Sequence, residues 1–248
     1  MTPKKIALLT DSSADLRWAE VQADNIFFVL LRILCQDGEY LDGVNIGGQD
    51  IYKRLHNGEL PQTSLPRVED FSAKLHEIFA MGFDGVIAVM LSSGLSGTYN
   101  LARIVSEECN AQGYQMRVFD SLSGALGQGM TVLQLAEDIR SGMGWEELTQ
   151  HRAPQLIANT YPFFTLDTLE YLKRGGRISK TVALAGGLLN IKPVVTVRDG
   201  EVVLIGKARG SKQGNNLLAE KIHTCGGIDF SLPILLGYSG LSDAFLKK

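Results

Sequence analysis

The segment from Leu91 to Tyr99, LSSGLSGTY, carries the residues whose types and spacing most favour binding chemistry. Three serines and a threonine stand in seven consecutive positions there, and no residue of the segment is charged. It follows the apolar run Gly85–Met90, which is typical of a buried strand. Gly94 and Gly97 permit close backbone approach, and a helix N-terminus attracts anions. The segment therefore predicts an anion-binding loop that uses hydroxyls and amides alone.

A serine nucleophile is the first alternative for this segment. Gly94–Thr98 resembles the G-x-S-x-G turn of hydrolases, except that threonine stands at the final glycine position. A triad in the order nucleophile, acid, histidine would have only His151 and His223 available, and both fall in predicted helices. A triad is therefore disfavoured. A serine-dependent acyl or phosphoryl transferase that uses Ser96 or Ser93 directly stays open as the alternative function.

The sequence lacks the residues that a phosphate loop, a dinucleotide-binding loop or a metal site would need. A Walker loop needs lysine after its last glycine, where Thr98 stands, and no GxGxxG follows the first predicted strand. No His, Asp and Glu cluster has metal spacing. The cysteines, Cys35, Cys109 and Cys225, are far apart, which predicts reduced thiols packed as small hydrophobic residues. We expect a binding site with no metal and no cofactor rather than a catalytic one.

Composition limits the class of protein. The chain has 248 residues, 45% of them hydrophobic and 21% charged, with a net charge of -3, as in globular proteins that do not bind nucleic acid. The apolar runs Ile6–Thr10 and Ile26–Leu31 are too short for a secretory signal or a membrane span. We expect a cytoplasmic protein. No repeat or heptad calls for a partner copy, so we expect a monomer.

The first part of the chain alternates strands and helices. Lys5–Thr10 predicts a buried strand followed by the turn Asp11–Ser13, in which Ser12 or Ser13 caps a helix from Ala14 and Ser12 is also a candidate ligand residue. Further strands are predicted at 85–90 and 115–120, and helices at 48–57, 68–81, 97–110 and 122–141. This order predicts a Rossmann-like parallel sheet in an N-terminal domain of residues 1–144.

A small β-ribbon is predicted to branch from that sheet over residues about 26–47. The β-rich run Ile26–Leu34 is followed by Asp37-Gly38, a strong hairpin signal, and by Glu39–Leu41. Beyond the helix at 48–57, prolines at both ends hold Pro61–Pro66 extended. The hydroxyls of Thr63 and Ser64 are therefore carried on a stiff segment.

Residues 145–248 predict a second α/β domain. Its expected elements are helices at 145–157, around 169–172, 179–189, 211–224 and from 242, and strands at 160–166, 192–197, 201–205 and 233–237. A DG turn joins the middle two strands, and Lys173–Arg177 forms a basic, glycine-containing turn. The less regular alternation predicts a mixed sheet with helices on one side.

Six segments together resemble the DegV family of fatty-acid-binding proteins. They are LLTDSSADL (8–16), TSLP (63–66), LSSGLSGTYN (91–100), VFDSLSGALGQG (118–129), LEYLKRGGRIS (169–179) and LLNIKPVVTVRDGEV (188–202). Some members of this family are the lipid-carrying subunit of bacterial fatty acid kinase. The resemblance implies that the chain binds one long-chain fatty acid between its two domains and presents the carboxylate to a separate kinase subunit. Transient contact with a membrane is compatible with that role.

The resemblance also implies roles for individual residues. Thr63 and Ser96 would bind the acyl carboxylate, with Ser93 and Ser64 as near neighbours, while Arg177 and Arg209 would contact the kinase subunit. The candidates for the wall around the acyl tail are Phe163, Phe164, Leu188, Leu189 and Ile191. Family members usually continue into a closing strand and a His-Thr-Gly-like turn, so a second domain without these last strands is expected from a chain that stops at Lys248.

Overall fold

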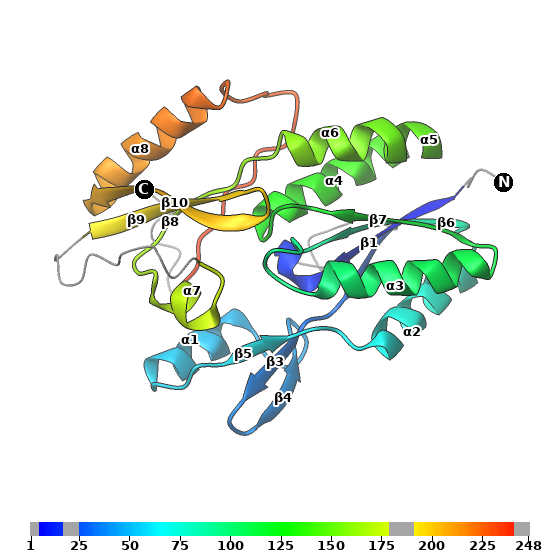
Figure 1. The fold of residues 1–248 in the computed structure, drawn as a ribbon, viewed down its shortest axis with the longest axis horizontal. Helices are drawn as coiled ribbons and strands as arrows, with labels where there is room; N and C mark the ends of the chain where they lie inside the picture. Colours follow the sequence, from blue (N-terminus) through cyan, green and yellow to red (C-terminus); the bar gives the residue numbers. More distant parts are fainter. Residues whose placement is uncertain (1–4, 17–24, 179–190, 241–248) are drawn as a thin grey trace.

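The computed structural model describes residues 5–16, 25–178 and 191–240. A four-stranded parallel sheet forms its centre, in the order β2-β1-β6-β7 (Figure 1). The two inner strands, β1 (Ile6–Asp11) and β6 (Gly85–Met90), are buried at every residue. β2 (Ile26–Val29) and β7 (Gln115–Asp120) flank them. Continuous apolar runs form the inner strands because both sheet faces are covered, and the predicted Rossmann-like sheet is confirmed.

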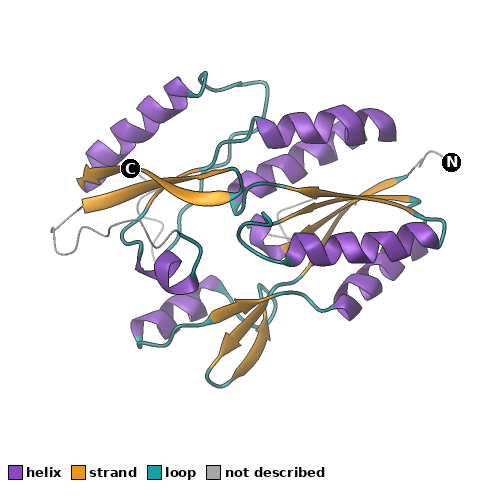
Figure 2. Cartoon of the chain, in the orientation of Figure 1, coloured by secondary structure: helices purple, strands orange, loops and turns teal. Residues whose placement is uncertain are grey.

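Helices cover both faces of this sheet (Figures 1 and 2). α2 (Val68–Ala80) and α3 (Thr98–Ala111) pack against one face. The other face packs against α4 (Leu126–Arg140) and against a continuous helical stretch made of α5 (Trp145–Glu147), the π-helical turn η2 (Leu148–Arg152) and α6 (Ala153–Ala158). Residues 145–158 therefore share a core with the N-terminal sheet. The division into domains at residue 144 stays a prediction.

The start of α4 differs from the prediction. The helix begins at Leu126 rather than at Leu122. Leu122 and Ala125 have φ angles of 49° and 51°, which are not helical, and the Ser121 hydroxyl donates to the carbonyl of Ser123 at 2.9 Å. A loop of polar backbone contacts thus replaces the predicted first turn.

The β-ribbon is a separate three-stranded sheet in the order β4-β3-β5. The hairpin of β3 (Arg32–Cys35) and β4 (Gly38–Leu41) is confirmed, and α1 (Gly48–His56) follows it. The apolar run from Ile26 is not one strand, because β2 leaves the main sheet after Val29 and β3 begins in the ribbon. β5 (Gln62–Ser64) adds an edge that the sequence predicted only as extended chain.

The second sheet has the order β10-β9-β8 and is antiparallel in its described strands, apart from a parallel bridge between Ile178 and Val202. β8 (Phe163–Thr165), β9 (Ile191–Arg198) and β10 (Glu201–Arg209) form it, with the predicted DG turn between the last two. α8 (Gly210–Thr224) packs on one face, and α7 (Glu170–Gly175) lies by the other. Helices therefore lie on both sides and not on one, because Val194 and Val195 bury opposite faces.

The strand predicted at Pro233–Gly237 is wrong, since these residues are irregular. Leu232 packs against the core of the parallel sheet, while the side chain of Leu236 is 84% exposed. Within the described residues this stretch pairs with no neighbouring strand, and a strand needs such a partner for its backbone groups. The helices predicted at 179–189 and from 242 lie outside the described residues. Among those described, none of the helices has the length and apolar character to cross a bilayer.

Candidate ligand site

The serine loop, Leu91–Gly97, lies where β1, β6 and β7 end. The amide of Leu91 donates to Asp11 Oδ2 at 2.7 Å, and the amide of Ser93 donates to both carboxylate oxygens of Asp120 at 3.2 Å. Asp11 and Asp120 are the last residues of β1 and β7. Because carboxyl ends of parallel strands meet at one edge, two strand-end carboxylates can hold a loop that follows a third strand.

Ser92 contacts the second sheet, which the sequence did not predict. Its buried hydroxyl donates to the carbonyl of Gly200 at 2.7 Å, in the turn between β9 and β10. Gly94 lies against the same turn, where an added Cβ would be 2.6 Å from that carbonyl oxygen. The glycine at position 94 is therefore required by a close backbone approach. Only the DG turn and the serine pattern were visible in the sequence, with no signal that they meet.

Ser96 stands at the N-terminus of α3. Its Oγ lies 2.9 Å from the Thr98 hydroxyl and accepts the Thr98 amide at 3.3 Å. Ser93 is exposed, whereas Ser96 is half-buried. A hydroxyl at this position can satisfy a helix amide and still face a ligand with its proton. The predicted loop of hydroxyls and glycines is thus present, while anion binding and the roles of Ser96 and Ser93 stay predictions.

Thr63 and Ser64 are in β5, where Thr63 pairs with Ile33 and Ser64 pairs with Arg32. Thr63 is exposed and Ser64 half-buried. The next residue, Leu65, reaches the serine loop, since an added Cβ on Gly97 would lie 3.3 Å from Leu65 Cδ1. The structure thus brings the Thr63 segment beside the start of α3. The shared use of Thr63, Ser64 and Ser96 by a ligand stays a prediction.

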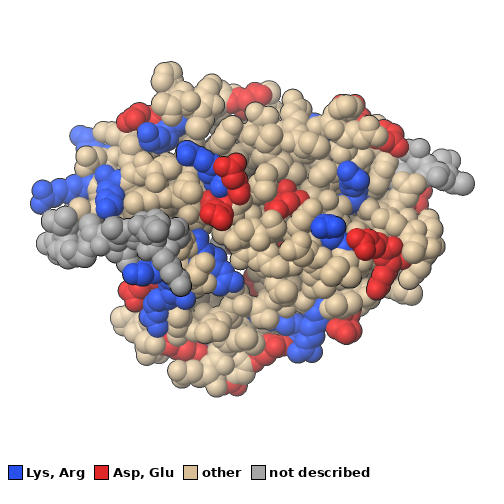
Figure 3. Space-filling view, in the orientation of Figure 1, with Lys and Arg blue, Asp and Glu red and all other residues tan. Residues whose placement is uncertain are grey.

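The two predicted partner-binding arginines occupy different places. Arg177 Nε donates to the carbonyl of Leu95 at 3.3 Å, so this exposed side chain borders the serine loop. Arg209 ends β10 and precedes α8. It is roughly 26 Å along the strand from Glu201, the residue after the Gly200 turn, at about 3.3 Å per residue. Lys and Arg atoms gather at the left edge of Figure 3, where Figure 1 places α8 and the end of β10.

Asp11 is a buried carboxyl at the base of the site, with no exposed surface. Burial raises its pKa, although hydrogen bonds from Leu91 and Ser13 oppose the rise. Its neighbour Gln128 is equally buried and donates to the Thr10 hydroxyl at 2.9 Å. These groups satisfy one another inside the fold, so they support the loop rather than face a ligand.

Among the described residues, neither His151 nor His223 forms a hydrogen bond with Ser93 or Ser96. Ser96 Oγ contacts Thr98, and His151 and His223 are exposed on helical segments. A possible cation group does exist in the described chain, where ligand atoms of Cys35, Asp37 and Glu59 lie within 4.8 Å of one another. Arg54 donates to Asp37 at 2.8 Å and to Glu59 at 2.9 Å, and offsets part of their negative charge.

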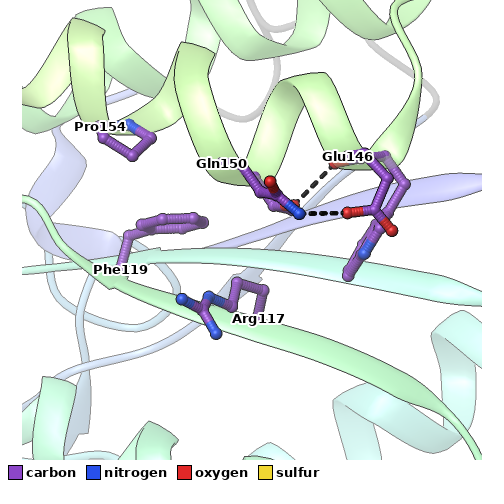
Figure 4. A pocket seen from close by; sticks show the side chains of 7 residues that line it. Arg117, Phe119, Glu146, Gln150 and Pro154 are labelled. Carbon is purple, nitrogen blue, oxygen red and sulfur yellow. Dashed lines mark hydrogen bonds between the residues drawn. The ribbon is translucent and has the colours of Figure 1, made fainter.

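A hollow of about 520 Å³ lies away from the serine loop, between β7 and the helical stretch 145–158 (Figure 4). Its lining is Arg117, Phe119, Trp145, Glu146, Thr149, Gln150 and Pro154. None of the predicted ligand residues lines it.

The acyl-tail candidates do not share one surface. Phe164 belongs to the small core beside α7, whereas Phe163, the next residue along β8, points to the opposite face. Ile191 is half-buried at the start of β9, and Leu188 and Leu189 lie outside the described residues.

The three cysteines differ in exposure, since Cys109 is buried, Cys35 is half-buried and Cys225 is exposed. The prediction of packed thiols is therefore wrong for Cys225.

Residues 5–244 match the family described as "Uncharacterised protein, DegV family". The chain belongs to the DegV family. It is 40% identical to a DegV domain-containing protein of Clostridium perfringens over 221 residues, which cover 88% of this chain and 77% of the relative. A DegV domain-containing protein of Caldanaerobacter subterraneus is 36% identical over 92% of this chain and 80% of its own length.

Solved DegV structures have the same fold. A fatty-acid-binding DegV family protein from Thermus thermophilus superposes with a TM-score of 0.80 and 31% identity, covering 90% of this chain and 78% of its own. DegV of Bacillus subtilis, described as a fatty acid binding protein, superposes with a TM-score of 0.75 and 28% identity, covering 89% of this chain and 77% of its own. A DegV family protein from Eubacterium eligens loaded with heptadecanoic acid superposes with a TM-score of 0.77 and 26% identity, covering 89% of this chain and 78% of its own.

Proposed function

We propose that this protein binds one long-chain fatty acid, with the carboxylate at the serine loop and the acyl chain between the two sheets. The observation that carries the proposal is the likeness to the Thermus thermophilus protein, whose description is fatty acid binding. The uncharged serine loop supports it, because hydroxyls and amides can hold a carboxylate while leaving an oxygen accessible. The protein is a non-catalytic carrier in this proposal, with the fatty acid as ligand and no cofactor.

The proposed ligand residues are Thr63 and Ser96, with Ser93 and Ser64 beside them. The proximity of Leu65 to Gly97 supports this assignment, since it sets the Thr63 segment against the N-terminus of α3. Most of the affinity would come from the tail. At about 0.8 kcal/mol per buried methylene, a C16 chain contributes on the order of 10 kcal/mol before the costs of ordering and association.

The second part of the proposal is that the carrier presents its ligand to a separate kinase subunit. A carboxylate oxygen would attack the γ-phosphorus of a nucleoside triphosphate held by that subunit, forming an acyl phosphate and releasing the diphosphate. Arg177 is the better placed of the two proposed partner contacts, because it borders the serine loop at Leu95. Arg209 would belong to a more distant part of the same interface. We place the carrier in the cytoplasm, and we propose that it is a monomer when it is not in contact with the kinase subunit.

The test is to extract the purified protein with organic solvent, identify acyl chains by mass spectrometry and titrate the stripped protein with hexadecanoate. We expect about one acyl chain per molecule and saturable binding. The double variant Thr63→Ala with Ser96→Ala should weaken binding by about 1–3 kcal/mol, from two lost hydroxyl contacts. Ser72→Ala with Thr224→Ala removes two hydroxyls that bond their own helices, and serves as the control. Absence of both bound and added fatty acid would refute the proposal.

The alternative is a serine-dependent acyl or phosphoryl transferase that uses Ser96 or Ser93. A fluorophosphonate probe separates the two functions, because it forms a stable adduct only with an activated serine. A carrier stays unlabelled. Labelling of the native protein that Ser96→Ala or Ser93→Ala abolishes would favour the enzyme.

A further inference from the structure

The turn that ends β1 forms hydrogen bonds to the serine loop and to the base of the ribbon that carries Thr63. We call Asp11, Ser12 and Ser13 the β1 junction. The sequence predicted these three residues as a turn in which Ser12 or Ser13 caps a helix, with Ser12 as a candidate ligand residue. In the structure they begin a short 3-10 turn (Ser12–Ala14), and their side chains reach three other parts of the chain. Each of these contacts spans at least 19 positions of sequence.

The first contact supports the serine loop. Asp11 Oδ2 accepts the Leu91 amide at 2.7 Å, across 80 positions of sequence. Asp11 Oδ1 accepts the Ser13 amide at 3.0 Å and also the Ser13 hydroxyl. Leu91 opens the serine loop, which carries Ser96, so Asp11 fixes where that loop leaves the sheet.

The second contact supports the ribbon. Ser12 Oγ accepts the Leu31 amide at 3.0 Å. Leu31 and Asp42 face each other at the base of the β3-β4 hairpin, where the Asp42 amide donates to the Leu31 carbonyl at 3.0 Å. Ser12 therefore bonds the base of the hairpin through Leu31, at the point where the ribbon leaves the main sheet. Two residues beyond Leu31, Ile33 pairs with Thr63.

The third contact makes the junction rigid. Ser13 Oγ lies 3.1 Å from Gln128 Oε1, and Gln128 Nε2 donates to Thr10 Oγ1 at 2.9 Å and to the Val89 carbonyl at 3.3 Å. Gln128 and Thr10 are fully buried. The junction is thus tied to β1, β6 and α4 together, and movement of the serine loop or of the ribbon base would break bonds to a fixed point.

We propose that Ser12 is a positioning residue for carboxylate binding, which sets the separation between Thr63 and Ser96. The proposal rests on the proposed fatty acid function. The carboxylate would need hydroxyls from two segments 33 positions apart. The serine loop is bonded to the β1 junction directly, and the Thr63 segment is connected to it through the ribbon. Loss of the Ser12 hydroxyl releases the ribbon base from the sheet and leaves the serine loop in place. The ligand should then lose its carboxylate contacts and keep those of its tail.

The experiment compares two probes, hexadecanoate and hexadecan-1-ol, by displacement of a fluorescent fatty acid from the stripped full-length protein. In Ser12→Ala we expect affinity for hexadecanoate to fall about tenfold and affinity for hexadecan-1-ol to change less than about twofold. Ser12→Thr keeps the hydroxyl and should retain the preference for the acid. Ser106→Ala is the matched control, because the Ser106 hydroxyl bonds only the Arg103 carbonyl of its own helix.

Ser12→Cys provides a near-isosteric second variant with a weak hydrogen-bonding group if Ser12→Ala does not fold. Equal loss for both probes, or no loss in either variant, would overturn the positioning role. So would a loss of acid preference in Ser12→Thr as large as that in Ser12→Ala. Failure of the unmodified protein to bind hexadecanoate would instead refute the proposed function, so the two failures are distinguishable.

Discussion

The Ser92 hydroxyl donates a 2.7 Å hydrogen bond to the carbonyl oxygen of Gly200, 108 positions later in the chain. This bond joins the serine loop to the turn of the second sheet. Gly200 has a φ of +80°, and an added Cβ there would lie 2.6 Å from Ser92 Oγ. The loop that carries Ser93 and Ser96 is therefore positioned by both sheets.

Removing this contact should destabilise the fold. Ser92→Ala leaves a buried carbonyl without its donor and should lower the free energy of unfolding by about 1–2 kcal/mol. Gly200→Ala adds a contact clash to the backbone strain and should cost about 1–3 kcal/mol. Gly142→Ala is the control, since its φ of +90° carries the same strain with nothing near the added Cβ. Urea unfolding measures all three. A cost for Gly200→Ala no larger than that for Gly142→Ala would contradict the proposed packing.

Ser96 allows capping to be separated from ligand binding. Ser96→Ala removes the acceptor of the Thr98 amide and should cost about 0.5–1 kcal/mol of stability. Ser96→Asp keeps an acceptor and places a negative charge at a helix N-terminus, so stability should be retained. That same charge would repel a carboxylate. We expect hexadecanoate binding, measured by titration, to be weaker in the stable Ser96→Asp protein than in Ser96→Ala. The reverse order would argue against a carboxylate at this position.

The buried Asp11 carboxyl should make stability depend on pH. Burial raises its pKa above 3.8, so its favourable contribution is complete below pH 3.8 and is lost as pH rises through the folded-state pKa. The free energy of unfolding of the unmodified protein relative to Asp11→Asn should therefore fall as pH increases from about 4.

Asp229→Asn is a control of opposite sign. The Ser231 hydroxyl and amide lower the pKa of Asp229, so its contribution is present above pH 3.8 and is lost as pH falls. Denaturant unfolding of the three proteins between pH 3.5 and pH 7, chosen to span the range about the reference pKa, measures both differences. If the free energy of unfolding of the unmodified protein relative to Asp11→Asn rose with pH, the inferred burial of this carboxyl would be contradicted.

The cysteines should differ in reactivity. Cys225 is exposed, while burial raises the pKa of Cys109 to about 11. Because the thiolate is the reactive form, iodoacetamide at pH 8 should label Cys225 first and leave Cys109 unmodified in the native protein. Mass spectrometry of the digested protein measures the order. Labelling in urea should remove the difference, and rapid native labelling of Cys109 would contradict its burial.

Much of the local structure could be predicted from the sequence. The apolar run Gly85–Met90 predicted β6 with the bounds observed, and the DG signals predicted both hairpins. These features depend on side-chain periodicity and turn chemistry, which neighbouring residues determine. The wrong strand at Pro233–Gly237 shows the limit, because a short β-rich run becomes a strand only when a neighbour pairs with it.

The sequence by itself determined that the loop after β6 has hydroxyls, glycines and no charge, and hence which ligands suit it. Only the tertiary structure decided what holds that loop. Asp11 meets Leu91, Ser92 meets Gly200 and Leu65 meets Gly97 across long separations in the chain. Residue types and spacing record local geometry, whereas these contacts arise because parallel strands bring their ends to one edge and the second sheet packs against it.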